Sequence, residues 1–334
     1  MSNGLGLAHS HISKRLDALD FGALLPGFHR FPFALYDGES VCLGNSEIKW
    51  DERFTGNTAI KYDGGWLAIW KLDGGDHDWD RMTANIVHEM CHARQCESGA
   101  EFADEVAGMF YPRDLANFAG RHAENLLLAR LADDFRPEGW AEFAGLRVAR
   151  RKLMAEAVDF EEKTEAIEGE ATYAELGALK ILSPNGYAKK LAGELARLRD
   201  MSMIFDVRLS CYSSGAVARM LAAANGAAAG RAGALPAPAV TAELEAEFKK
   251  YFGAIDGLLA SAMAGAERLG GGMELVGYDP YNVRASGNLL YHPSFVGCQK
   301  KGEKPRFLMG RFVTAMKGRS LEIESIYRVP AAAL

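Results

Sequence analysis

The stretch that decides the fold runs from Thr83 to Arg94 and reads Thr-Ala-Asn-Ile-Val-His-Glu-Met-Cys-His-Ala-Arg. Three of its residues, His88, Glu89 and His92, form the pattern H-E-x-x-H. Residues four apart on an α-helix lie on one face, so two imidazoles at this spacing can reach the same metal ion. We expect Glu89 to point toward water on that metal, because zinc lowers the pKa of bound water to about 7 and a carboxylate can then accept the proton.

The residues around this pattern are typical of a buried helix. Ile86, Val87 and Met90 supply its apolar positions. Gly99 can end the helix, and one of three polar residues can cap its start: Asp78, Asp80 or Thr83. The alternative interpretation of the same five letters is a helix with two hydrogen-bonded histidines and a solvated glutamate, without a metal.

A site with two histidines needs a third protein ligand, and we expect it to be Glu168. The sequence around this residue reads as one continuous helix, on which Glu168, Thr172 and Glu175 share a face. One carboxylate can therefore bind the metal while the hydroxyl or the second carboxylate orients a histidine. Glu165 and Glu170 are the alternative ligands.

Two segments together resemble a known group of enzymes. H-E-x-x-H, followed by E-G-x-A-x-Y-x-E from Glu168, is similar to the gluzincin-type zinc metallopeptidases, which include thermolysin and aminopeptidase N. The resemblance implies that His88, His92 and Glu168 bind Zn²⁺. It also implies that Glu89 is the general base in the hydrolysis of peptide or protein substrates, and that the fold is zincin-like.

The chain departs from this group in two ways. Residues 93–167 separate the histidines from Glu168, which is a longer gap than is usual in thermolysin or aminopeptidase N. The upstream G-x-M-E-N motif of the exopeptidases is absent, and the similar letters at 271–275 come after the metal motif. Aminopeptidase activity is therefore not implied.

The patterns along the chain predict an α+β fold in three parts. Residues 1–110 form a strand-rich N-terminal lobe with the motif helix, and residues 111–272 form a mostly helical lobe with the third ligand. Residues 273–334 form a C-terminal β segment, ending in a hairpin, that packs on the same catalytic unit. The acidic cluster at 159–165 is interpreted as a solvated face, and the Ala- and Gly-rich residues 222–240 as a surface connection.

A hairpin is expected from Ala59 to Leu72, with the turn signal Asp-Gly-Gly between its strands. In gluzincin-like folds, an edge strand beside the metal helix pairs with the substrate backbone. The strand Trp66–Leu72 is the candidate by its order in the chain, because an open edge can add a peptide as one more strand. An ordinary interior strand is the alternative.

A peptidase also needs a donor for the oxyanion that develops at the scissile carbonyl. Four residues near the C-terminus form the pool of candidates: Tyr278, Tyr281, Tyr291 and His292. We select Tyr281 and Tyr291. Arg208 and Tyr212 are polar groups that the sequence does not place relative to the cleft.

The composition is that of an ordinary globular chain without nucleic-acid or membrane partners. A net charge of −6 and a pI of about 5.8 give no reason to expect binding to polyanions. The five cysteines are odd in number and form no C-x-x-C pair, which favours a reducing cytoplasm. Residues 1–6 lack the features of a secretory signal, and no run is apolar enough to span a membrane.

Two other functions are compatible with the sequence. The letters from His88 to Ala93 also resemble the SprT-like DNA-associated metalloproteases, whose third ligand is a histidine soon after the helix. The first histidine after the motif is His122, and the acidic pI argues against DNA. A non-catalytic binding protein that keeps the metallopeptidase core is the other alternative.

Overall fold

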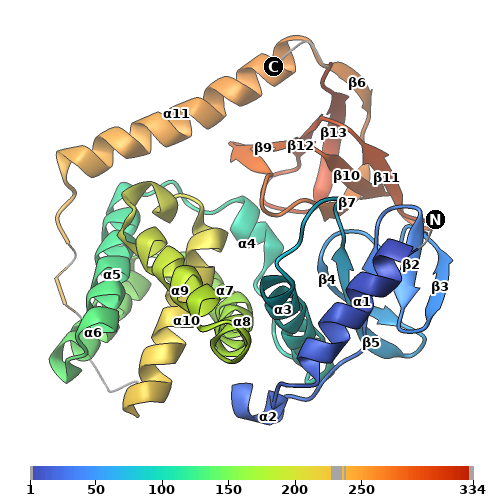
Figure 1. Cartoon of the computed structure of the whole chain (residues 1–334). Helices are drawn as coiled ribbons and strands as arrows, with labels where there is room; N and C mark the ends of the chain where they lie inside the picture. Colours follow the sequence, from blue (N-terminus) through green and yellow to red (C-terminus); the bar gives the residue numbers. More distant parts are fainter. Residues whose placement is uncertain (1–2, 227–234, 237, 331–334) are drawn as a thin grey trace.

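A computed structural model describes residues 3–226, 235–236 and 238–330 of the chain (Figure 1). An N-terminal sheet is followed by a mostly helical middle and a second, C-terminal sheet, so the chain is a mixed α+β protein. Of the connection expected at 222–240, residues 227–234 and 237 lie outside the described residues. No helix in the described part is long and apolar enough to cross a lipid bilayer.

The N-terminal sheet has five strands in the order β3-β2-β1-β5-β4. They are β1 (Phe33–Tyr36), β2 (Ser40–Leu43), β3 (Ser46–Lys49), β4 (Thr58–Tyr62) and β5 (Gly65–Lys71). The expected hairpin is present, because β4 and β5 pair across a turn in which Asp63 and Gly64 both have positive φ. However, β5 is not the edge strand. It pairs in parallel with β1 on its other side, so β4 forms the open edge.

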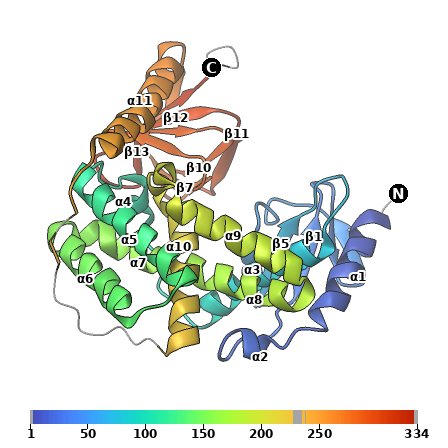
Figure 2. The same ribbon diagram turned by 60° about the vertical axis from the view of Figure 1, so that its left-hand side comes forward.

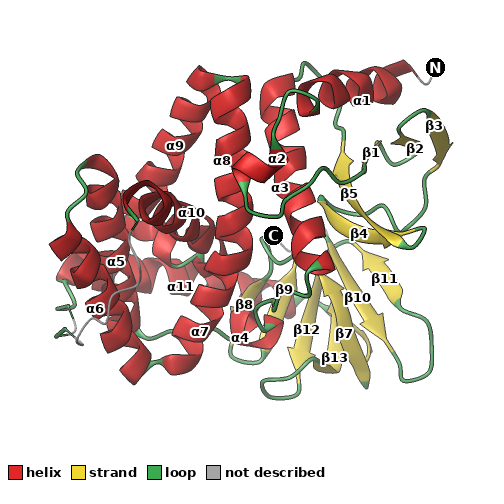
Figure 3. Ribbon diagram, turned by 90° about the horizontal axis from the view of Figure 1, so that it is seen from below, coloured by secondary structure: helices red, strands yellow, loops and turns green. Residues whose placement is uncertain are grey.

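The helix α3 (Trp79–Glu97) carries the H-E-x-x-H pattern and begins where the Asp78 side chain accepts two backbone N–H bonds. It packs against α1 (Asn3–Leu16) and β5, and α8 (Glu170–Leu182) runs beside it (Figure 3). Three of its apolar side chains are fully buried in the core between these elements: Ile86, Val87 and Met90. Each such burial stabilises the fold by about 1.5–3 kcal/mol, so α3 is a rigid support for its polar face.

The middle of the chain is helical. Besides α8, its elements are α4 (Glu105–Met109), α5 (Leu115–Asp133), α6 (Pro137–Leu153), α7 (Ala155–Thr164), η1 (Glu165–Gly169), α9 (Pro184–Arg199), η2 (Met201–Ile204) and α10 (Val207–Asn225). A further short helix, α2 (Phe21–Leu24), lies near the N-terminus. Met154, which has a non-helical backbone conformation, separates α6 from α7. Between α7 and α8, η1 is a single π-helical turn.

A charged cluster lies inside this helical middle. Arg150 donates to Glu124 at 2.8 Å and to Glu161 at 2.6 Å, and Arg121 pairs with Glu161. Burial opposes ionisation of Glu161, but Arg121 and Arg150 outweigh it and hold the pKa well below its usual range. The acidic cluster at 159–165 is therefore only partly solvated, because Glu161 and Glu165 are enclosed and paired with arginines.

The C-terminal part is an antiparallel sheet against which α11 (Ala242–Ala264) packs (Figure 2). Its strands are β6 (Glu267–Gly270), β7 (Met273–Tyr278), β8 (Arg284–Ser286), β9 (Leu289–His292), β10 (Phe295–Gln299), β11 (Arg306–Met309), β12 (Phe312–Met316) and β13 (Glu322–Arg328). The expected terminal hairpin is β12 and β13. The order is β11-β10-β7-β13-β12-β9-β8, and β6 also pairs with β13.

Candidate metal centre

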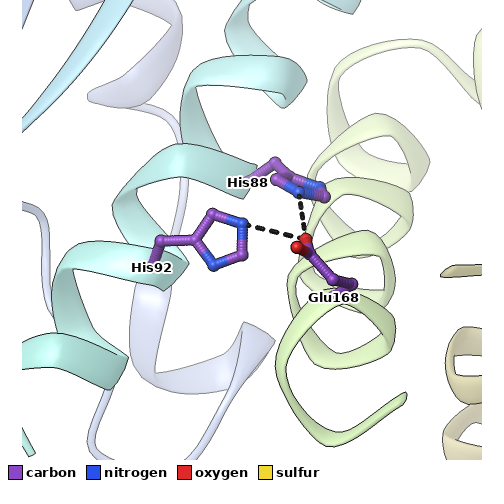
Figure 4. A group of neighbouring side chains, drawn as sticks. All are labelled: His88, His92 and Glu168. Carbon is purple, nitrogen blue, oxygen red and sulfur yellow. Dashed lines mark ion pairs between the residues drawn. The ribbon is translucent and has the colours of Figure 1, made fainter. Parts of the chain in front are cut away.

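Two histidines of α3 and one glutamate of η1 converge on a common point (Figure 4). His88 Nε2 lies 3.7 Å and His92 Nε2 lies 3.2 Å from Glu168 Oε2. The three ligand atoms are all within 4.8 Å of one another. In a tetrahedral zinc site with bonds of about 2.0–2.1 Å, ligand atoms are about 3.3 Å apart, so this spacing suits a single ion.

The chemistry of the three groups also fits a cation. Glu168 Oε2 is buried and accepts no hydrogen bond from the described residues. The two Nε2 atoms that face it present lone pairs when each histidine carries its proton on Nδ1. In that tautomer three acceptor atoms face one another, and a divalent metal between them supplies the positive charge that stabilises the arrangement.

Both Nδ1 atoms have acceptors that support this tautomer. His88 Nδ1 lies 3.5 Å from Glu175 Oε2, and His92 Nδ1 lies 2.8 Å from Gln95 Oε1. The Gln95 amide is fixed in turn, because its Nε2 donates to the Ile167 carbonyl oxygen at 2.9 Å. Such outer contacts hold histidine ligands in position around zinc. Glu175 thus occupies the orienting place expected for it, whereas the buried Thr172 hydroxyl has no partner among the described residues.

The surroundings of the site are acidic. Burial disfavours a charged His88, but Glu168 and Glu175 outweigh it and raise its pKa to about 10. Burial likewise opposes ionisation of Glu168, yet His92 and His88 lower its pKa well below the usual range. The carboxylates of Glu168 and Glu175 therefore make the electrostatic potential at the site negative. A divalent cation is stabilised by such a potential.

Glu89 lies beside the ligands and lines the same cleft. Its side chain is buried, which raises its pKa, and Glu168 and Glu175 add to the rise against the effect of the two histidines. The Glu89 carboxylate takes part in no hydrogen bond or ion pair with the described residues. A free carboxylate with a raised pKa is suited to accept and return a proton.

Glu168 reaches the histidines from the π-helical turn η1, which packs closely on α10. A Cβ atom on Gly169 would lie 2.5 Å from the Cα of Gly215, so a side chain on either residue would force the two helices apart at this crossing. Glu165, at the start of η1, points the other way and is held by Arg147 at 2.8 Å and by the Ser214 hydroxyl. The glycine contact and these polar bonds together fix the position of the third ligand.

The site lies in a cleft of about 830 Å³. One wall is the segment from Thr55 to Ala59, which leads into the open edge strand β4. The opposite wall includes Tyr212 of α10 and Tyr281 of the β7–β8 loop. Their hydroxyls are hydrogen-bonded to each other, and the Tyr212 ring stacks on His88 with centroids 5.8 Å apart.

The remaining candidate residues have different positions. Tyr281 lines the cleft, whereas Tyr291 packs in an apolar cluster with Ile255 and Val313 and is not part of the cleft wall. His292 is buried and hydrogen-bonded to Thr314. Of the two selected tyrosines, the structure therefore brings only Tyr281 near the ligands, because β9 is an interior strand of its sheet.

The alternative ligands lie elsewhere. Glu165 pairs with Arg147, and Glu170 pairs with Arg94 and Arg219. His122 is on α5 and belongs to no metal-capable group of the described residues.

Arg208 joins the site from α10. It donates to Glu168 Oε1 at 3.3 Å and to Glu105 at 2.7 Å. The sequence could not place this residue or Tyr212, because nothing local indicates which face of α10 meets η1. Gln95 was missed altogether, although its spacing of three residues from His92 is a usable signal on a helix.

No protein-family model matches the chain, and neither a curated protein nor a solved structure is significantly similar to it.

Proposed function

We propose that the protein is a zinc-dependent peptidase with a zincin-like catalytic unit. The observation that supports this most is the convergence of His88, His92 and Glu168, with each histidine oriented from its Nδ1 side. This is the ligand set of catalytic zinc sites that leave one position open.

Zinc, when bound, supplies Lewis-acid activation of water and of the scissile carbonyl. Glu89 accepts the proton of the attacking water and delivers it to the leaving amine. Tyr281 and Tyr212 are hydrogen-bonded to each other, so the hydroxyl that accepts this bond keeps its own proton free and donates it to the oxygen that becomes negative at the scissile carbon. Glu175 and Gln95 hold the two imidazoles in the productive tautomer.

The substrate is a peptide or protein segment in extended form. The free edge of β4 offers backbone N–H and C=O groups beside the cleft, and an extended peptide satisfies them as an added strand.

The test measures metal content and hydrolysis separately. We expect about one zinc ion per wild-type chain, zinc retained without hydrolysis in Glu89→Gln, and zinc lost in His88→Ala and Glu168→Ala. His122→Ala serves as the control and keeps its zinc. Loss of zinc in His122→Ala but not in Glu168→Ala would favour the SprT-like alternative, and a Glu89→Gln protein as active as wild type would end the mechanism. Zinc binding without cleavage of a broad peptide library would favour a binding protein.

A further inference from the structure

A second cavity lies directly behind the metal cleft. It measures about 130 Å³, is partly open, and is lined by residues of α4, α5, α7, α11, the start of α10 and the β7–β8 loop. Its walls include many aromatic rings, among them Phe118, Phe160, Phe205, Tyr251, Phe252 and Tyr278, and also charged residues. An apolar cavity of roughly 150 Å³ in a protein core is large enough for one benzene ring. The size of this cavity therefore suits a single aromatic side chain.

The cavity and the metal cleft share part of their walls. Arg208, Tyr278, Pro280 and Tyr281 line both. Arg208 is 3.3 Å from Glu168, and Tyr281 is hydrogen-bonded to the tyrosine that stacks on His88. A group in the cavity is thus separated from the metal ligands by one layer of side chains.

The charged residues at the cavity are already paired. Arg208 binds Glu105, Tyr251 donates to Asp206 at 2.9 Å, and Arg113 donates to Asp256 at 2.7 Å. Arg284 donates to the Tyr281 carbonyl oxygen at 2.9 Å. The Arg113 guanidinium also lies over the Phe252 ring, 4.5 Å from its centroid. Because these charges have partners, the groups without a partner in the wall are mostly apolar, and an uncharged ring is the group that complements them.

We propose that this cavity is a specificity pocket for an aromatic side chain adjacent to the scissile bond. The identity of the occupant as a substrate residue rests on the proposed peptidase function, whereas binding of an aromatic ring does not. Burying a side chain of this size favours it over alanine by on the order of 10- to 100-fold.

The experiment compares two probes, N-acetyl-phenylalanine amide and N-acetyl-alanine amide, by calorimetric titration of the zinc-loaded protein. We expect the phenylalanine probe to bind at least tenfold more tightly. Val283→Trp fills the cavity and should abolish the difference, and Ala285→Met should reduce it if Val283→Trp fails to fold. Val276→Trp is the matched control, because Val276 is exposed on β7 and does not line the cavity; it should keep the difference.

Equal affinity of the wild-type protein for both probes would overturn the pocket, as would an unchanged difference in Val283→Trp. Hydrolysis of peptides provides an independent measurement. If the protein discriminates between the probes but cleaves no peptide, the proposed pocket stands and the proposed peptidase function is refuted. If the protein cleaves peptides without preference for aromatic residues, the proposed peptidase function stands and the specificity pocket is refuted.

Discussion

The contact between Gly169 and Gly215 makes a sharp prediction for Gly215→Ala. A Cβ atom on Gly215 would lie 2.6 Å from the Glu165 carbonyl oxygen and 2.9 Å from the Cα atoms of Glu165 and Gly169. All three atoms belong to the backbone of η1, so no side chain can move aside. Ordinary contacts are about 3.5 Å or longer, so α10 and η1 must separate by roughly 0.5–1 Å.

Two opposing effects decide whether Gly215→Ala raises or lowers the free energy of unfolding. Alanine in place of glycine inside a helix normally stabilises by about 0.5–1 kcal/mol. Overpacking of a close contact costs about 1–3 kcal/mol. We therefore expect a net destabilisation on the order of 1–2 kcal/mol. Because Glu168 moves with η1, zinc affinity should fall by on the order of tenfold or more, as it does when an outer contact of a metal ligand is lost.

Urea unfolding and zinc titration against a chelator measure the two effects. Gly193→Ala is the matched control, since Gly193 lies in α9 and a Cβ there meets no atom within 4 Å. The control should be as stable as wild type or slightly more stable, with unchanged zinc affinity. If Gly215→Ala behaves like Gly193→Ala in both measurements, the close crossing does not position the third ligand and the reasoning is refuted.

Three other predictions concern separate parts of the molecule. Glu175→Gln should weaken zinc binding by on the order of 10- to 100-fold, measured by chelator competition, because His88 loses its anionic acceptor; unchanged affinity would show that Glu175 does not orient the ligand. Arg150→Met should destabilise the fold by about 3–5 kcal/mol in urea unfolding, because it leaves Glu161 buried with fewer partners; a loss below about 1 kcal/mol would contradict this. Burial lowers the pKa of His292 to about 4, so its stabilising effect is complete above pH 6.5 and is lost as the pH falls toward 4. His292→Asn should therefore remove on the order of 2–3 kcal/mol of the difference in unfolding free energy between pH 7 and pH 4.5, and an equal difference in both proteins would refute it.

Local periodicity explains what the sequence could predict. The motif helix, the hairpin before it and the terminal hairpin depend on residues close in the chain, and they are present in the structure. Glu168 was expected as the third ligand from the helix face that it shares with Thr172 and Glu175 and from the resemblance to a metallopeptidase motif, but no local rule joins segments so far apart.

Long-range packing explains what the sequence could not predict. β4 is the open edge because β1 returns to pair with β5, and a strand's own letters do not reveal its partner on either side. Tyr281 and Tyr291 look alike in sequence, but a loop position places one at the cleft and an interior strand encloses the other. The buried carboxylate of Glu161 has the same local pattern as a solvated one, and only the arginines of other helices distinguish it.

The single π-helical turn from Glu165 to Gly169 has a consequence for how this helix can change in evolution. A π-helical turn holds one residue more than an α-helical turn, so deleting one position here would close the turn and change the directions in which its side chains point. Glu161 and Glu165 would then leave their arginines, or Glu168 would leave the histidines. In the widened turn, Glu165 binds Arg147 while Glu168 faces the two histidines. Chains that share this arrangement should therefore align across it without a gap, even where every other length varies.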